Sequence, residues 1–202
     1  MQISVRLIAA IVLAAASLAA SLAASAQTAL RVRGTITAID AAGISVKSRS
    51  GEDLRIALAD NLAVAVATAA KFEDIKPGDY VGSAAMRGAD GRLTALEVHY
   101  LAPNVPGGHT DWDLAPGSTM TNANVAEALV GATGVRELTL RYKDGEQKIV
   151  VPVQAPIVRA IPGARADLKV GEYVFIAAQS APDGRLTAQR IQVSRDGIKP
   201  PQ

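Results

Sequence analysis

The stretch Asp74–Val81, which reads DIKPGDYV, decides the fold because it occurs twice in the chain. Its second copy is Asp167–Val174, DLKVGEYV, and the similarity continues without a gap from Asp74–Val98 to Asp167–Ile191. In these segments 13 of 25 positions are identical at a constant offset of 93 residues. A constant offset with matching turn residues indicates an internal repeat of one structural unit, and we predict two modules of about seventy residues each.

Each module reads as a series of short strands separated by turn residues. In the first module, Leu30–Ile39 alternates between apolar and polar residues and is rich in Val, Thr and Ile, which favour a pleated surface. Lys76-Pro77-Gly78-Asp79 is predicted to form a turn, because Pro fixes φ and Gly accepts a positive φ. The Ala-rich stretch Asn61–Glu73 is compatible with a short helix or an extra strand. The other expected strands are Ile44–Ser48, Leu54–Leu58, Tyr80–Met86, Leu93–Leu101, Met120–Leu129, Glu137–Lys143, Gln147–Val153, Glu172–Gln179 and Leu186–Val193.

Five short strands per module, with a longer gap before the fourth, are typical of a small barrel of the OB type. We therefore predict an all-β protein with two tandem five-stranded OB-like barrels. The expected organisation is a signal peptide at 1–26, a first module at 27–101, an inter-module segment at 102–118, a second module at 119–195 and a C-terminal tail at 196–202.

The N-terminus has the pattern of a secretory signal peptide. Arg6 precedes the apolar stretch Leu7–Ala20, and Ala24-Ser25-Ala26 places small residues where a signal peptidase cuts. We therefore expect a periplasmic or secreted protein. The alternative is an uncleaved membrane anchor, because Leu7–Ala26 is almost long enough to span a bilayer. The chain has no Cys, which argues against a lipoprotein and leaves no disulfides in an exported protein.

Composition argues against several classes of function. After the signal peptide, 20 basic and 19 acidic side chains remain, so the balance does not favour nucleic acid or anionic lipid as a partner. After Arg31 no apolar run of about 18 residues occurs, so we expect no membrane span in the mature chain. OB barrels stack nucleic-acid bases on aromatic residues, and this chain has only seven.

The repeat resembles a known bacterial family. Gly34–Asp40, the DIKPGDYV segment and the later DGRLTALEV at Asp90–Val98 are similar to a bacterial domain of unknown function built as exported OB-like barrels, often in tandem. The resemblance covers nearly the whole mature chain. It implies a fold and an exported location, and it implies no chemistry.

Residues 102–118, between the modules, carry side chains that a plain linker lacks. This segment has three Pro, three Gly and the only Trp of the chain. We identify four candidate ligand-binding residues in it: His109, Asp111, Trp112 and Asp113. The alternative is structural, with Trp112 buried against a barrel as an anchor and the Asp side chains capping turns. In that case we expect Trp112 to be largely buried.

A metal site is the second interpretation of the same region. His109, Asp111 and Asp113 mix imidazole and carboxylate ligands for a transition metal ion. Glu97 and His99, which alternate on one strand face, are expected to join them. There is a looser similarity to the periplasmic copper- and silver-carrying OB barrels, which combine a His, a Trp and two Met. His109, Trp112, Met120 and Met86 supply those residue types here, although Met120 lies in the next module.

Catalysis finds little support in the sequence. The chain has no Cys and no G-x-S-x-G elbow, and no nucleophile, base and orienting group can be named together. We therefore expect an exported non-enzymatic protein that binds a protein, glycan or small ligand without a cofactor. The alternative is a periplasmic metal-binding or metal-handling protein.

We predict that the exported form begins at Gln27, because Ala24-Ser25-Ala26 is followed by two polar residues. Intact-mass measurement of the protein recovered from the periplasm or medium should give the mass of residues 27–202. Exported material that retains Met1 would contradict this prediction and favour the anchor.

Overall fold

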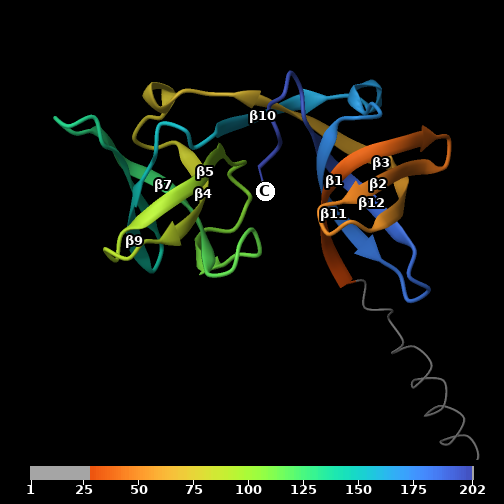
Figure 1. Cartoon of the computed structure of the whole chain (residues 1–202), viewed down its shortest axis with the longest axis horizontal. Helices are drawn as coiled ribbons and strands as arrows, with labels where there is room; N and C mark the ends of the chain where they lie inside the picture. Colours follow the sequence, from red (N-terminus) through yellow and green to blue (C-terminus); the bar gives the residue numbers. More distant parts are fainter. Residues whose placement is uncertain (1–27, 202) are drawn as a thin grey trace, which may run out of the picture.

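The computed structural model describes residues 28–201, and the expected signal peptide lies outside them. The described chain is nearly all β-structure arranged as two barrels side by side (Figure 1). Its elements are β1 (Thr28–Asp40), β2 (Gly43–Ser48), β3 (Asp53–Ala69), η1 (Phe72–Asp74), β4 (Tyr80–Arg87), β5 (Leu93–Tyr100), β6 (Gly108–Asp111), β7 (Ser118–Val130), β8 (Arg136–Tyr142), β9 (Gly145–Val150), β10 (Ile157–Gly163), η2 (Arg165–Asp167), β11 (Tyr173–Ser180) and β12 (Leu186–Val193).

The first barrel contains strands from both sequence modules. Its order is β1-β2-β3-β12-β11, and β11 pairs with β1 to close it. All neighbours are antiparallel except β3 and β12, which are parallel. The first three strands come from the beginning of the chain and the last two from its end.

The second barrel repeats this order with a continuous piece of chain. Here β7, β8 and β9 are followed by β5 and β4, and β4 pairs with β7 to close the barrel. The parallel neighbours are now β5 and β9. The short β6 adds to the edge of β7 through pairs such as His109 with Thr121. The described chain thus confirms an all-β fold with five-stranded barrels.

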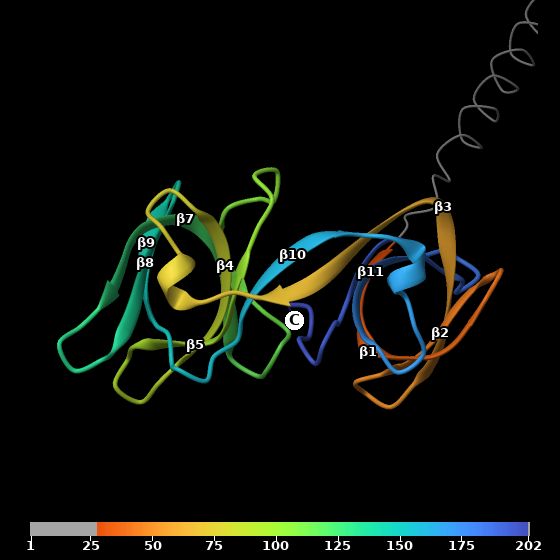
Figure 2. The ribbon, with the colours of Figure 1, turned by 90° about the horizontal axis from the view of Figure 1, so that it is seen from above.

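The two barrels are joined by a crossing ribbon, which we define as Val64–Ala69 of β3 paired antiparallel with Val158–Gly163 of β10. Strand β3 is 17 residues long and contains no Gly or Pro, so it has no tight turn that would return the chain to the first barrel. It leads instead into the second barrel, and β10 leads back (Figure 2).

This crossing differs from our expectation for the modules at 27–101 and 119–195. Each sequence module gives three strands to one barrel and two to the other, so the sequence repeats and the barrels are different units. The second barrel and its ends occupy residues 70–156, inserted between the two parts of the first.

The repeated segments form the same elements in both modules, as the constant offset predicts. The pairs η1 and η2, β4 and β11, and β5 and β12 all begin 93 residues apart. Gly78 and Gly171 both adopt a positive φ at the equivalent turn, at +92° and +94°. The stretch Asn61–Glu73 forms the second half of β3 followed by the 3-10 turn η1.

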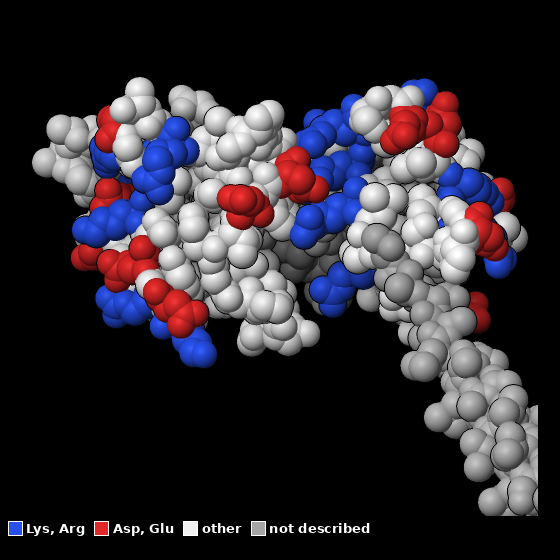
Figure 3. All heavy atoms as spheres, turned by 90° about the horizontal axis from the view of Figure 1, so that it is seen from below, with Lys and Arg blue, Asp and Glu red and all other residues white. Residues whose placement is uncertain are grey.

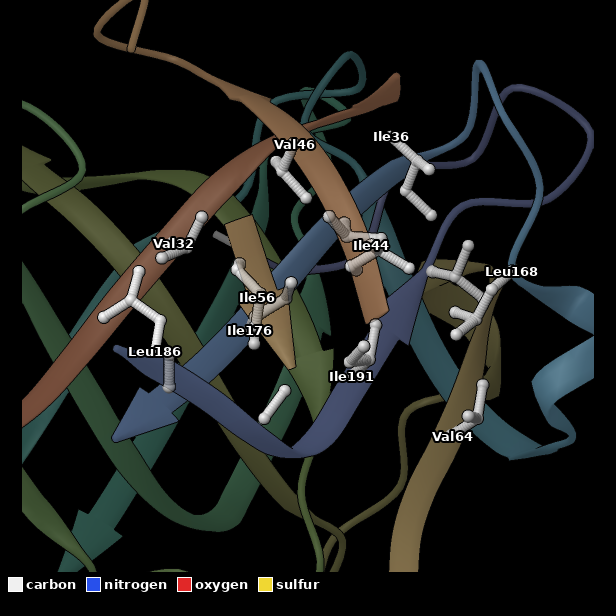
Figure 4. Packing of buried hydrophobic residues seen from close by; sticks show 14 of the residues in the cluster. Val32, Ile36, Ile44, Val46, Ile56, Val64, Leu168, Ile176, Leu186 and Ile191 are labelled. Carbon is white, nitrogen blue, oxygen red and sulfur yellow. The ribbon is translucent and has the colours of Figure 1, made fainter. Parts of the chain in front are cut away.

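Each barrel has its own apolar core. In the first, Val32, Ile44 and Ile56 from the start of the chain pack against Ile176 and Ile191 from its end (Figure 4). These five side chains are at most 2% exposed. The second core contains Val81 and Val98 together with Leu138, Leu140 and Ile149. Each core therefore joins residues of both modules, and neither module can bury its apolar surface alone in this arrangement.

Among residues 28–201, no helix has the length and apolar character needed to cross a membrane.

We predict that fragments will fold according to the barrels and not according to the sequence modules. Residues 70–156 contain all five strands of the second barrel and should fold as a monomer, whereas residues 27–101 lack β11 and β12 and should not form a monomeric barrel. Circular dichroism melting and light scattering after gel filtration would measure both. A cooperatively folded monomer of 27–101 would show that the crossing is not required.

Candidate functional site

A cavity of about 630 Å³ lies between the two barrels. The first barrel contributes Phe175, Arg190 and Gln192, the second contributes His99 and Met120, and the crossing ribbon contributes Ala65, Ala160 and Pro162. Trp112, from the inter-module segment, and Pro201, from the C-terminal tail, also line it. Figure 3 shows the hollow between the barrels, with Lys and Arg side chains gathered on the side of the first barrel that faces it.

The two walls of the cavity are equivalent faces of the two modules with different side chains. The 93-residue offset relates His99 to Gln192 and Gly82 to Phe175. It also relates Glu97 to Arg190, so the charge at this position is reversed between the modules. The repeat thus produces a two-walled site, and the substitutions make that site asymmetric.

Gly82 allows two polar side chains to lie close to the second barrel. A Cβ at position 82 would be 2.5 Å from His99 Nε2 and 2.8 Å from Asn122 Oδ1. Such distances are shorter than any ordinary contact, so only Gly lets both side chains cover β4 here. His99 and Asn122 lie on the strands either side of Gly82 and both line the cavity.

Polar atoms without hydrogen-bond partners are concentrated at this wall. Within the described chain, His99 Nδ1, Tyr100 Oη and Asn122 Oδ1 are buried and accept or donate no hydrogen bond. His99 Nδ1 lies 3.5 Å from Glu97 Oε1, which is an ion-pair distance if the imidazole is protonated but too long for a good hydrogen bond. Burial also raises the pKa of the Tyr100 hydroxyl. Buried polar atoms of this kind cost free energy unless water or a ligand satisfies them.

The tip of the inter-module segment contacts the first barrel through arginines. The carboxylate of Asp113 accepts two hydrogen bonds from the guanidinium of Arg33, at 2.7 and 3.2 Å, and lies 3.6 Å from Arg31. Arg49 donates to the carbonyl oxygens of Asp113 and Leu114. The segment is therefore a structured clasp from the second barrel to the first.

Trp112 is part of this clasp and is intermediate in burial, with the larger part of its surface covered. The Arg31 guanidinium carbon is 4.4 Å from the centre of its ring, and that of Arg33 is 5.8 Å away. Cation–π contact holds the indole at the cavity edge, where one part stays open to solvent.

The other candidate ligand-binding residues do not join Trp112 and Asp113 at one point. His109 Nδ1 lies 2.8 Å from Thr121 Oγ1, and neither His109 nor the exposed Asp111 lines the cavity. Partial burial, and then the positive charge of Arg87, lower the pKa of His109. Both effects disfavour the charged form of the His109 imidazole.

The residues of the metal alternative form only a partial group. Glu97, Met120 and Met86 lie on the outer face of the second barrel, since Glu97 and Met120 both pair with Ala84 and Met86 is two residues further along β4. His99 lies on this face with Glu97. His109 instead pairs with Thr121, which lies on the opposite face of β7 from its neighbours Met120 and Asn122. Among the described residues no three His, Cys, Asp or Glu side chains are grouped as metal ligands.

The fold and the cavity together define an all-β protein of two interlocked barrels with a cavity between them. The chain belongs to the family described as a domain of unknown function, DUF5666, whose model matches residues 33–99 and 157–192. These two segments include parts of all five strands of the first barrel. No curated protein and no solved structure matches the chain.

Several residues that line or flank the cavity have no distinguishing pattern in the sequence. Nothing in the sequence distinguishes Arg31, Arg33 and Arg190 from other polar residues of the predicted strands. Phe175 and Gln192 likewise appear only as members of strands in the second module. A comparison of the two modules position by position would have shown that Glu97 and Arg190 are equivalent and opposite in charge.

We predict that Asp113→Asn weakens the clasp in a pH-dependent way. The hydrogen bonds from Arg33 lower the pKa of Asp113, so its stabilising effect is complete above its usual pKa and is lost as the pH falls through the lower, folded-state value. At pH 7 the substitution should lower the free energy of unfolding by about 1–2 kcal/mol, because Arg33 is buried while half of Asp113 is in water.

Denaturant unfolding of both proteins between pH 7 and pH 3 would measure this difference, which should shrink below about pH 4. Asp111→Asn is the matched control, because Asp111 is exposed and forms no salt bridge among the described residues. An equal effect of both substitutions would contradict a specific role for Asp113.

Proposed function

We propose that this is an exported binding protein that holds a small ligand in the cavity between its two barrels. The volume of about 630 Å³ supports the proposal, because binding pockets for small molecules commonly have between about 300 and 1,000 Å³. The signal-peptide pattern at 1–26 supports export.

The chemistry of the lining favours a small, partly apolar ligand over a glycan. Most of the wall is apolar, from residues such as Ala63, Val105, Trp112, Ile161, Pro162 and Phe175. A few polar groups, including His99, Asn122 and Gln192, interrupt it. An apolar cavity with a small number of polar groups is the usual anatomy of a small-molecule site, whereas a sugar would need many more hydrogen-bonding groups.

The position of the cavity also favours binding. It lies where two barrels, the clasp and the C-terminal tail meet, and sites between domains are common places for ligands. The unsatisfied atoms of His99 and Asn122 would gain partners from a polar group of the ligand. The cavity is the one observation on which the proposal depends.

We predict that the uncharged dye N-phenyl-1-naphthylamine, which fluoresces in apolar surroundings, binds the cavity with a dissociation constant in the micromolar range. Trp112 lines the cavity, so its emission should fall as the dye binds. Ala65→Phe puts a large side chain into the cavity and should weaken binding by at least about tenfold.

Ala57→Phe is the matched control, because Ala57 is an exposed residue of the same strand that does not line the cavity. Thermal melting of each variant would confirm that it is folded. The proposal fails if the wild-type protein does not bind the dye, or if the two Phe variants bind it equally.

A further inference from the structure

We propose that the ligand is an amphipathic organic anion whose acid group pairs with Arg190 while its apolar body fills the cavity. This inference rests on the proposed function and adds the chemical class of the ligand. It is carried by an arginine that lines the cavity and has no partner of its own.

Arg190 differs from the other charged residues near the cavity. It is exposed on β12 and lines the cavity, and its guanidinium group forms no salt bridge or hydrogen bond with any residue in the range 28–201. Arg33, by contrast, is buried and holds Asp113. Its equivalent in the other module, Glu97, is buried beside His99. One module has thus buried its charge, and the other presents the opposite charge at the cavity.

The neighbourhood of Arg190 is positively charged. Arg31 of β1 and Arg190 of β12 both lie directly opposite Ala177 of β11, one on each side. Residues in one row of a sheet point to the same face, so the side chains of Arg31 and Arg190 flank the small, exposed Ala177. Their strands, β1 and β12, are about 10 Å apart, because β11 lies between them. An acid group above Ala177 would lie between two cations. Figure 3 shows the cationic side chains on this side of the cavity.

The acids nearby do not cancel this charge. Asp113 accepts two hydrogen bonds from Arg33 and is 3.6 Å from Arg31. Its single negative charge therefore neutralises only part of the positive charge of these two arginines. No described acid forms an ion pair with Arg190, since Asp113 pairs with Arg33 and Glu97 lies beside His99. Since guanidinium binds carboxylate and sulfonate groups strongly when partly shielded from water, this corner favours an anionic group.

The rest of the cavity provides for an apolar body. The wall next to Arg190 is formed by Ala63 of β3, which pairs with Arg190 in the sheet, and by Ala65, Ala160, Ile161 and Pro162 of the crossing ribbon. Phe175 and Trp112 add aromatic surface. One cationic corner on an apolar cavity selects a molecule with one acid group and a hydrocarbon or aromatic body, such as a fatty acid or an aromatic acid.

A pair of dyes tests this inference directly. The dye 8-anilinonaphthalene-1-sulfonate has the same ring system as N-phenyl-1-naphthylamine with an added sulfonate. Titration of the full-length mature protein should show that the sulfonate dye binds at least about tenfold more tightly, and that this preference falls as salt screens the charge. Laurate should displace either dye better than lauryl alcohol does.

Two variants identify the residue responsible. Arg190→Gln should reduce the preference for the sulfonate dye to near one. Arg185→Gln, which removes the same charge from an exposed residue outside the cavity, should leave both affinities unchanged. A preference that survives Arg190→Gln, or equal affinity of the wild type for both dyes, would overturn the anionic ligand and leave the proposed function intact. Failure of both dyes to bind would overturn the proposed function as well.

Discussion

The antiparallel pairing of β3 with β10 is the constraint on which the rest of the structure depends. Because β3 continues from the first barrel without a turn, the strands that follow it must complete a different barrel. The chain then needs β10 to return, and the two strands satisfy each other's backbone groups where they leave the barrels. The crossing ribbon therefore determines the barrel composition, the mixed cores and the cavity.

The cavity follows from this arrangement because equivalent faces of the two modules meet across it. Two identical modules would give a symmetric site, with the same groups on each wall. The chain instead has His99 on one wall where the other has Gln192, and it has Gly82 and Glu97 at the positions equivalent to Phe175 and Arg190. A symmetric site suits a symmetric ligand or a second barrel, whereas an asymmetric one suits a molecule with two different ends.

Much of the fold could be predicted from the sequence, and much less of the site. The repeat and its turn residues indicate each strand of the barrels, because alternation and turns are local properties of the chain. Barrel composition is not local, since it depends on whether Asn61–Glu73 turns back or continues. The sequence drew attention to Trp112 and Asp113 as unusual residues in a linker, and the structure places both in the clasp. It gave no reason to choose Arg190, because that residue matters only through a cavity formed by distant strands.

The insertion of the second barrel between β3 and β10 has a mechanical consequence. Both β1 and β12 belong to the first barrel, and the tail that follows β12 lies between the two barrels (Figure 1). A pulling force applied through these two strands would be carried by the first barrel alone, while residues 70–156 would experience none of it until β3 and β10 were separated. If the N-terminal segment tethers the chain to a surface, stretching would unfold the first barrel, which forms one wall of the cavity, and leave the second barrel folded.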